Sequence, residues 1–502
     1  MRNHIFMAVA LGLCGVLATG CSDSDLLNDD THAADAGRPV TFSKFSPAEG
    51  PARTRLFIYG DNFGTDPSKI KVTVGGQDAK VVSSTGDIIM AQVKKNSFHK
   101  VIGSDQQDYQ SEITVGVTGD DGKQIADYTF GDKFTYQATK QVGTLVRNVD
   151  EKGNSVYSEG YYGVDGGTGS LACSDWLVFD PKWKEGDDRV LFSTNWTDGF
   201  WSINLDKKYI KRQFPRTQYS SMRSFTFTQD GDTILFADVN NENESFNKPN
   251  IYYATRSEDF SKLHTYCYGP GASSIVQMPD GTKFYASEPG SSVWRMGPNT
   301  NEEGGLPFDD EERVQMFDMT KYITGNQSLG WNPALMMIMH PSGKYVYITS
   351  CDIFGVFRCD YNPVTHELES PVLVAGTASS LENGCKEGTG NGARFTRPWS
   401  GFFAKNNDYV VNPRPDGDEY DFYLTAMEGN DCIWRITPDG VATIAAGRSN
   451  ESQDGKTTGF VDGDPLHEAR LDCPKGLAYD VNTDTFYFYD YTYHALRYMT
   501  VE

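Results

Sequence analysis

The sequence lacks the short motifs that mark several large classes of enzyme. It contains no Gly-x-Ser-x-Gly nucleophile elbow, no Walker phosphate loop and no His-Glu-x-x-His zinc motif. No Cys-x-x-Cys pair and no Cys/His spacing suggests zinc either. The glycine-rich run at residues 388–392 resembles a phosphate loop only superficially, because it lacks the lysine that such a loop needs. The sequence therefore predicts no catalytic residue and no metal ligand, and it favours a binding function over an enzyme.

Basic residues are few compared with acidic ones. The chain has 45 Lys and Arg against 68 Asp and Glu, which gives a formal net charge of −23 at pH 7. Proteins that bind nucleic acid need a cationic surface. We therefore expect no nucleic-acid partner, and polyanionic ligands are not the default expectation.

No bilayer-spanning helix is predicted at the N-terminus, because the apolar run at residues 5–17 covers only about a dozen residues. The run follows Arg2 and leads into Leu-Ala-Thr-Gly-Cys at residues 17–21. This arrangement resembles a bacterial lipobox, where cleavage before the cysteine precedes lipidation of its thiol. The resemblance implies a signal peptide over residues 1–20 and a lipid anchor on Cys21.

Residues 21–38 are acidic and poor in apolar side chains, so they cannot bury enough surface to order themselves. We predict a flexible tether. An acidic run just after the lipidated cysteine also resembles the surface-export signal of Bacteroidetes lipoproteins. The resemblance implies an outer-membrane protein exposed at the cell surface, and retention in the periplasm stays open.

The number and spacing of the cysteines do not determine a disulfide pattern. Nine cysteines fall to seven once Cys14 and Cys21 are set aside, and an odd number leaves at least one thiol free or paired between chains. Cys351 and Cys359 are the nearest candidates for a pair, whereas buried free thiols are an equally open interpretation.

What the sequence has in abundance is glycine and aromatic residues, at 50 glycines and 13% aromatics, which is typical of an all-β protein with many turns. Residues 39–137 contain short strand-like runs at 56–59, 71–74, 88–93 and 113–117, separated by Gly/Asp/Asn turns. Strands this short, with closely spaced turns, predict an antiparallel β-sandwich.

The sandwich resembles a known family in its details. The Phe-Ser-Pro-Ala-Glu-Gly run at 45–50 precedes Leu-Phe-Ile-Tyr-Gly-Asp-Asn-Phe-Gly at 56–64, and Ile-Lys-Val-Thr-Val-Gly-Gly follows at 70–76. These segments resemble the IPT/TIG family of immunoglobulin-like domains, most specifically in the Gly-x-Asn-Phe-Gly turn. The resemblance covers 39–137 and implies a spacer or an interaction module.

Residues 142–502 contain six internal repeats of about 50–70 residues each. Each repeat opens with an apolar strand and a tight turn, and two more strands follow. The opening segments lie at 176–180, 225–231, 275–281, 337–343, 401–404 and 476–480. Repeated antiparallel sheets of this size predict a six-bladed β-propeller. The last repeat ends after three strands, so we expect residues 143–149 to supply its fourth strand and to close the ring.

The last two repeats resemble NHL repeats, through residues 388–401 and through 459–463, 469–471 and 474–480. An IPT/TIG domain with an NHL propeller behind a lipobox resembles proteins of Bacteroidetes polysaccharide-utilisation systems. The resemblance covers nearly the whole mature chain. It implies a polysaccharide or oligosaccharide ligand and outer-membrane importer components as partners.

One face of a propeller collects the loops that lead into the first strands and those that join the second strands to the third. Aromatic rings stack on sugar C–H faces, and carboxylates accept bonds from sugar hydroxyls, so we selected such residues from these loops. The candidate ligand-binding residues are Tyr161, Tyr162, Trp196, Glu288, Trp331, Asp352, Trp399, Tyr491 and Tyr493. For Trp399 a packing role stays equally open, and Tyr491 and Tyr493 could equally line the channel.

Three functions remain in view. The first is a non-catalytic, cell-surface glycan-binding lipoprotein without a cofactor. The second is a metal-assisted hydrolase or lyase, because some six-bladed propellers hold a central calcium, and Glu288, Asp352 and Asp490 could converge on one. The third is a protein-docking scaffold at the outer membrane. Fold alone does not decide among them.

Overall fold

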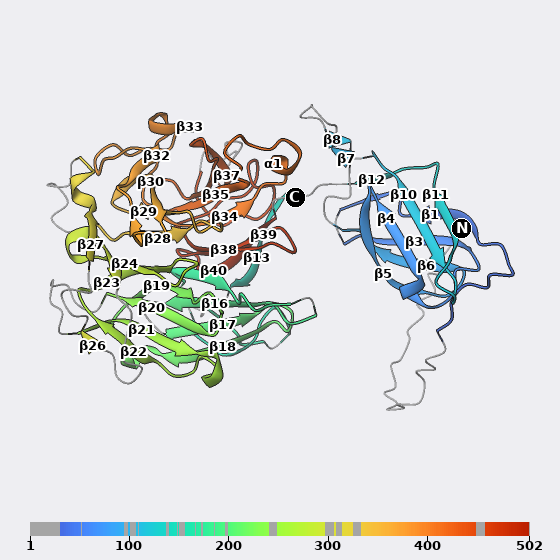
Figure 1. Cartoon of the computed structure of the whole chain (residues 1–502), viewed down its shortest axis with the longest axis horizontal. Coiled ribbons are helices and arrows are strands. Elements are labelled where there is room, and N and C mark those ends of the chain that lie inside the picture. Colours follow the sequence, from blue (N-terminus) through green and yellow to red (C-terminus); the bar gives the residue numbers. More distant parts are fainter. Residues whose placement is uncertain are drawn as a thin grey trace, which may run out of the picture. The chain divides into compact units, whose positions relative to one another are not determined.

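The structure is a computed structural model of the 502-residue chain. It describes residues 31–51, 53–94, 99–100, 107–108, 110–136, 140–147, 149, 156–165, 167–171, 174–184, 186–195, 199–239, 248–296, 306–307, 314–324, 333–447 and 457–500. The predicted signal peptide, Cys21 and the first part of the tether lie outside these residues. The chain divides into two compact units, residues 1–99 with 107–137 and residues 100–106 with 138–502. Figure 1 shows that both units consist almost entirely of strands, so the predicted all-β fold class is confirmed.

The first unit is built on a seven-stranded sheet and a smaller three-stranded sheet. In spatial order the larger sheet is β1 (Thr41–Ser46), β3 (Arg55–Asp61), β6 (Ile88–Gln92), β5 (Gln77–Ser84), β4 (Ile70–Val74), β10 (Ile113–Thr118) and β11 (Gln124–Thr129). The smaller sheet is β2 (Glu49–Gly50), β12 (Phe134–Tyr136) and β9 (Gln110–Ser111), and β7 (His99–Lys100) pairs with β8 (Gln107–Asp108).

The larger sheet curls so that its two edge strands meet. Phe42 of β1 stacks on Tyr128 of β11, with ring centroids 4.7 Å apart and ring planes 3° from parallel. Strand β10 alternates buried and half-buried residues, and its buried side chains Ile113, Val115 and Val117 belong to the core of this unit. This period-two pattern is the one that predicted the sandwich.

The predicted flexible tether is wrong for its C-terminal part, because residues 32–38 pack on the sandwich. Ala33 and Ala34 are buried, and the amide of Thr65 donates to the His32 carbonyl at 2.8 Å. The side chain of Asn62 bonds the backbone of Asp35 and Arg38. The segment has too few apolar residues to order itself, but backbone hydrogen bonds to the neighbouring turn hold it in place.

The second unit is a ring of six sheets, or blades. Blade 1 is β15 (Trp176–Phe179), β16 (Val190–Asn195), β17 (Gly199–Asn204) and β18 (Tyr209–Pro215), with β14 (Gly160–Tyr161) outside β18. Blade 2 is β19 (Met222–Phe227), β20 (Thr233–Asp238), β21 (Pro249–Thr255) and β22 (His264–Tyr268), with β26 (Leu306–Pro307) outside β22. Blade 3 is β23 (Ala272–Gln277), β24 (Lys283–Ser287), β25 (Ser292–Met296) and β27 (Val314–Asp318).

The remaining blades follow the same plan. Blade 4 is β28 (Met336–Met339), β29 (Tyr345–Ser350), β30 (Ile353–Asn362) and β32 (Val372–Gly376), with β31 (Glu367–Leu368) on the far end of β30. Blade 5 is β34 (Pro398–Lys405), β35 (Tyr420–Ala426), β36 (Cys432–Ile436) and β37 (Val441–Gly447), with β33 (Gly388–Thr389) outside β37. Blade 6 is β38 (Pro474–Asp480), β39 (Thr485–Asp490), β40 (Ala495–Thr500) and β13 (Gln141–Arg147).

Helical structure is limited to short segments among the described residues. These are α1 (Asp408–Val411) and the 3-10 turns η1 (Pro67–Lys69), η2 (Arg216–Gln218), η3 (Arg256–Glu258), η4 (Pro289–Ser291), η5 (Met319–Lys321) and η7 (Gly390–Gly392).

The six blades form a closed ring, which confirms the predicted six-bladed propeller. The first strands β15, β19, β23, β28, β34 and β38 each contact the first strand of both neighbouring blades. Strand β13 pairs antiparallel with β40, from Gln141 opposite Thr500 to Arg147 opposite Ala495. Figure 1 shows β13 lying beside the last blade. The strand that follows the sandwich therefore completes the blade at the C-terminus.

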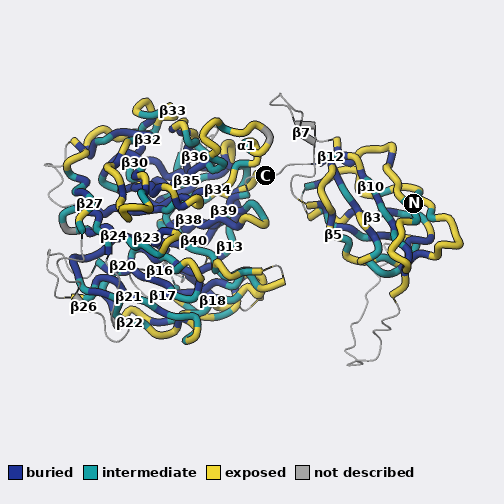
Figure 2. Tube along the Cα trace, viewed as in Figure 1, coloured by how far each residue is buried: buried dark blue, intermediate teal, exposed yellow. Residues whose placement is uncertain are grey.

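The first and second strands of the blades are buried on both faces, as stacked sheets require. All six residues of β23 and of β29 are buried, and Figure 2 shows buried strands with exposed connecting turns. We call the face where the first strands begin the start face, and the opposite face, where they end, the end face.

Side chains on the end face join neighbouring blades. Asp180, after the first strand of blade 1, accepts hydrogen bonds from Arg256 of blade 2 at 2.7 and 2.8 Å. Asp280 of blade 3 accepts from Tyr361 of blade 4 at 2.6 Å. In the same way Asp418 of blade 5 accepts from Tyr345 of blade 4 at 2.7 Å.

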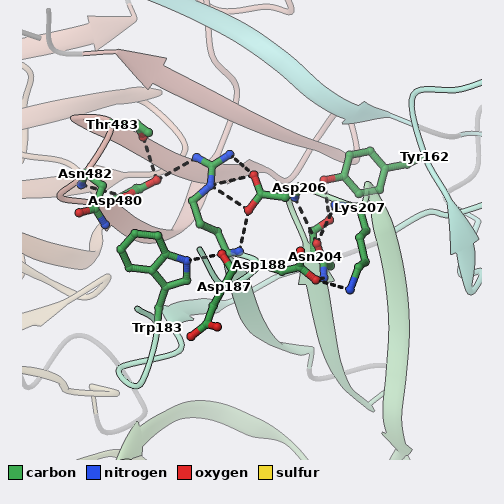
Figure 3. A network of polar contacts seen from close by, with 11 residues as sticks. Tyr162, Trp183, Asp187, Asp188, Asn204, Asp206, Lys207, Asp480, Asn482 and Thr483 are labelled. Carbon is green, nitrogen blue, oxygen red and sulfur yellow. Dashed lines mark hydrogen bonds and ion pairs between the residues drawn. The ribbon is translucent and has the colours of Figure 1, made fainter. Parts of the chain in front are cut away.

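The same kind of bridge joins the first and last blades. Arg189 of blade 1 donates to Asp206 of its own blade and, at 3.0 Å, to Asp480 of blade 6. Asp480 also accepts from the backbone amide of Asn482 and the hydroxyl of Thr483 (Figure 3). The hydrogen bonds that Arg189 donates to Asp206 raise the pKa of its guanidinium, although the partial burial of Arg189 opposes this. The guanidinium stays charged, so this bridge supports ring closure at neutral pH.

Candidate functional site

The start face carries a charged and aromatic cluster around the propeller axis. Lys475, the second residue of β38, places its Nζ 3.0 Å from Asp175 Oδ1, in the segment that leads into blade 1. The same ammonium lies 4.1 Å from the ring centroid of Tyr491 and 5.6 Å from that of Trp399. Lys475 is therefore fixed by one carboxylate and two aromatic rings, which come from three different blades.

Trp399 lies at the centre of these contacts. Its side chain is only 2% exposed, and its indole Nε1 donates to the Asp175 carbonyl at 3.3 Å. The guanidinium of Arg223 lies 5.9 Å from its ring centroid. Cations over an indole face are attracted by its quadrupole. The ring therefore positions Arg223 and Lys475.

Arg223 continues the cluster towards blades 3 and 4. Its Nε lies 3.7 Å from Glu288 Oε2. In blade 4 the Cys351 thiol donates to Asp352 at 3.3 Å. Burial raises the pKa of Cys351 to about 12 and the Asp352 charge adds to this, whereas the charges of Arg397 and Arg223 oppose it. This thiol is therefore un-ionised at neutral pH and is not a nucleophile.

Every blade contributes to what we call the axial cluster. Its members are Asp175, Arg223, Glu288, Asp352, Trp399, Lys475 and Tyr491. Two of its buried polar atoms, Asp175 Oδ2 and Arg223 Nε, have no hydrogen-bond partner among the described residues. Such atoms are costly to bury unless another group satisfies them. The cluster therefore has the capacity to bind a ligand that donates to a carboxylate and accepts from a guanidinium.

The structure brings four of the predicted ligand-binding residues together in this cluster, namely Glu288, Asp352, Trp399 and Tyr491. Trp399, however, is too deeply buried to offer a stacking face, so it acts as a support for two cations. Tyr493 lies outside the cluster, with its ring 5.2 Å from Phe460, and Arg147 lies 4.5 Å from the Phe460 ring. Trp196 and Trp331 lie outside the described residues.

The expectation that Tyr161 and Tyr162 belong to this face is wrong. Tyr162 is 3% exposed, and its hydroxyl donates to the carbonyl of Asn204 at 3.2 Å, on the end face (Figure 3). Tyr161 is exposed on the added strand β14, where it pairs with Tyr209 of β18. Both residues were expected in the loop that leads into blade 1, but the chain first forms an extra strand on the outer edge of that blade.

Sequence reasoning missed Asp175, Arg223 and Lys475. Arg223, Trp399 and Lys475 are each the second residue of a first strand, in β19, β34 and β38. Aligning the repeats by this register, instead of by their apolar residues, exposes the pattern. Asp175 does not share this position, because it lies one residue before β15.

The three carboxylates that the sequence suggested as calcium ligands, Glu288, Asp352 and Asp490, do not come together. Asp490 is completely buried and accepts a hydrogen bond from the equally buried Arg497 at 2.9 Å, in place of meeting Glu288 and Asp352. Within the described part of the chain no group of three or more His, Cys, Asp or Glu residues could hold a metal ion. Cys351 and Cys359 are free thiols, so the pair considered for them is absent.

Comparisons with known proteins agree with both units. Residues 39–136 match the IPT/TIG domain family, and no curated protein matches the chain. An auxiliary nutrient binding protein from Bacteroides thetaiotaomicron VPI-5482 is 28% identical with a TM-score of 0.61, covering 93% of this chain and 99% of that one. One from Bacteroides ovatus ATCC 8483 is 26% identical with a TM-score of 0.64, covering 93% and 99%.

A third structure, provisionally described as a phosphatase from Bacteroides thetaiotaomicron VPI-5482, is 25% identical with a TM-score of 0.63 and covers 93% and 98% of the two chains. No helix within the described residues has the length and apolar character to cross a membrane. The chain thus carries an IPT/TIG domain and a six-bladed propeller, and it is similar over almost its whole length to two Bacteroides proteins described as nutrient binding.

Proposed function

We propose that this protein is a non-catalytic glycan-binding lipoprotein of a polysaccharide-utilisation system, anchored at the outer membrane through Cys21 and exposed at the cell surface. The axial cluster is its binding site, and the last two blades are NHL repeats. The observation that carries the proposal is a pair of buried polar atoms at the axis, Asp175 Oδ2 and Arg223 Nε, which have no hydrogen-bond partner among the described residues. The description of two similar Bacteroides proteins as nutrient binding supports a saccharide ligand.

Binding is tested by native affinity electrophoresis of the mature protein in gels that contain starch, xylan, pectin, mannan or mucin. We expect at least one glycan to retard the protein and Arg223→Gln to abolish the retardation. Arg256→Gln is the matched control, since Arg256 has a similar exposed fraction, 30% against 31%, but lies on the end face. Trp196→Ala and Trp331→Ala test whether those aromatic residues extend the site. Absence of retardation by every glycan contradicts the proposal.

Anchoring is tested separately in cells. We expect Cys21→Ser to move the protein from the outer-membrane fraction to the soluble fraction. Digestion of whole cells with proteinase K distinguishes the surface, where the protein is degraded, from the periplasm, where it is protected. Co-purification of an outer-membrane importer from crosslinked cells tests the proposed partner, and co-purification without any glycan binding favours a protein-docking scaffold.

A hydrolase is the second candidate, and the description of one similar structure as a phosphatase favours it. The acidic side chains of the axial cluster would then act on a bound substrate. Release of p-nitrophenol from p-nitrophenyl phosphate, with and without Ca²⁺, tests this directly. Turnover that disappears in Asp352→Asn supports the hydrolase, and its absence supports the binding protein.

A further inference from the structure

The exposed fraction of the side chains in the axial cluster decreases from Arg223 and Glu288 to Asp175. The side chains of Arg223 and Glu288 are 31% and 28% exposed, that of Lys475 is 14% exposed, and that of Asp175 only 1%. Asp175 Oδ1 already accepts from Lys475, and its other oxygen, Oδ2, has no partner among the described residues. The deepest point of the cluster is therefore an acceptor that a ligand could satisfy.

The second unsatisfied atom has the opposite character. Arg223 Nε is a buried donor that faces Glu288 Oε2 at 3.7 Å, beyond hydrogen-bond distance, and it has no hydrogen-bond partner in the described part of the chain. A hydroxyl group both donates and accepts, so adjacent hydroxyls satisfy a carboxylate oxygen and a guanidinium N–H together. The cluster holds two cations and three carboxylates, so its charges nearly balance and it has no strong preference for a charged ligand. Neutral sugar hydroxyls fit this chemistry.

The topology decides how such a ligand can enter. The six blades surround the axis, and each supplies a member of the cluster. An internal segment of a linear glycan would need two openings, since its chain continues at both ends. A terminal residue needs only one, with the rest of the chain leaving towards solvent.

Building on the proposed function, we propose that the axial cluster recognises the terminal residue of a neutral glycan end-on, with sugar hydroxyls on Asp175 and Arg223. The binding site is therefore specific for chain ends, and the face around it contributes little beyond the first residues. The Kd per chain end should depend only weakly on chain length. The apparent affinity for a given mass of glycan should therefore rise with the number of chain ends that it contains.

The test uses matched series: glucose, maltohexaose and amylose; xylose, xylohexaose and xylan; mannose, mannohexaose and mannan. In calorimetric titrations of the mature protein we expect the monosaccharide and the hexasaccharide of the bound series to differ less than about threefold in Kd. Partial acid hydrolysis of the bound polysaccharide should increase its competing strength per gram in proportion to the chain ends formed. Neither measurement requires a variant to fold.

Asp175→Asn then tests the assigned acceptor, because it replaces one carboxylate oxygen with a donor of the same shape. We expect it to weaken binding at least tenfold. Asp480→Asn is the matched control, since Asp480 is also buried and bonded to a cation, Arg189, on the end face.

The outcomes separate the two proposals. Affinity that rises steadily up to the hexasaccharide, with competition set by mass and not by ends, overturns end-on recognition and leaves glycan binding intact. Unchanged binding by Asp175→Asn also overturns it. Binding of no glycan at all overturns both.

Discussion

The side chain of Asn62 holds the backbone of Asp35 from both sides. The Asn62 carbonyl oxygen accepts the Asp35 amide at 2.9 Å, and the Asn62 amide donates to the Asp35 carbonyl at 2.9 Å and to the Arg38 carbonyl at the same distance. Asn62 itself adopts a left-handed conformation, with φ of 63°. The asparagine of the Gly-x-Asn-Phe-Gly turn therefore ties the segment before the sandwich to its sheet.

Removing this side chain should release residues 32–38. Asn62→Ala loses three hydrogen bonds and places a residue with a Cβ in a left-handed conformation, whereas Asn62→Gly loses the bonds without that strain. We expect amide hydrogen exchange of a peptide over residues 32–38 to accelerate at least tenfold in both variants, measured by mass spectrometry. The loss of global stability should be larger in Asn62→Ala by about 1 kcal/mol. Unchanged exchange in both variants would show that the packing of Ala33 and Ala34 and the bond from Thr65 to His32 hold the segment without Asn62.

Ring closure has its own test at Gly143 of β13. A Cβ at this position would lie 2.3 Å from Cζ of Tyr498, its partner on β40. Gly143→Ala should therefore displace the tyrosine ring and lower the free energy of unfolding by about 1–3 kcal/mol. Thermal unfolding of the variant measures this loss. Gly392→Ala is the control, because nothing lies within 4 Å of its added Cβ.

A double variant isolates the contact. If the clash with the ring causes the loss, the cost of Gly143→Ala should shrink when Tyr498→Ala is already present. Additive losses would instead mean that the strand pairing itself tolerates no side chain at position 143.

The sequence allowed the fold to be predicted further than the site. Blade number and the closing strand follow from repeated apolar strands, whose period reflects burial that every blade shares. The site depends on single polar residues such as Arg223 and Lys475, which break that apolar pattern. Tyr161 and Tyr162 were misplaced because the extra strand β14 is only two residues long and has no periodicity to read. Trp399 was predicted as a ligand-binding candidate with a packing role equally open, and its burial depends on neighbours from other blades that sequence order does not reveal.

Bridges between blades should stabilise the ring more than exposed ion pairs do. Arg256→Met removes the guanidinium that binds Asp180 with two hydrogen bonds, and it leaves a carboxylate that is only 16% exposed without that partner. We expect a loss of about 1–3 kcal/mol in chemical denaturation. Arg38→Met removes a pair with Asp61 in which both side chains are more than half exposed, and it should change stability very little. Equal effects of the two variants would show that the bridge adds nothing beyond surface charge.

Acid should weaken the contact between blades 3 and 4 at Asp280. Burial opposes the charge on this carboxylate, but hydrogen bonds from Tyr361, Thr282 and His366 outweigh it and lower its pKa to about 2 from an ordinary value of 3.8. Because the folded state holds the proton less tightly than the unfolded chain, the contribution to stability is fully present above pH 4 and disappears between about pH 4 and 2. Tyr361→Phe removes one of these hydrogen bonds, so it should raise the pKa of Asp280 and flatten the fall in stability over this range. Denaturation midpoints from pH 6 to pH 2 measure the difference, with Tyr128→Phe on the sandwich as the reference. Parallel curves for Tyr361→Phe and the unmodified protein would mean that Asp280 is held by Thr282 and His366 without the tyrosine.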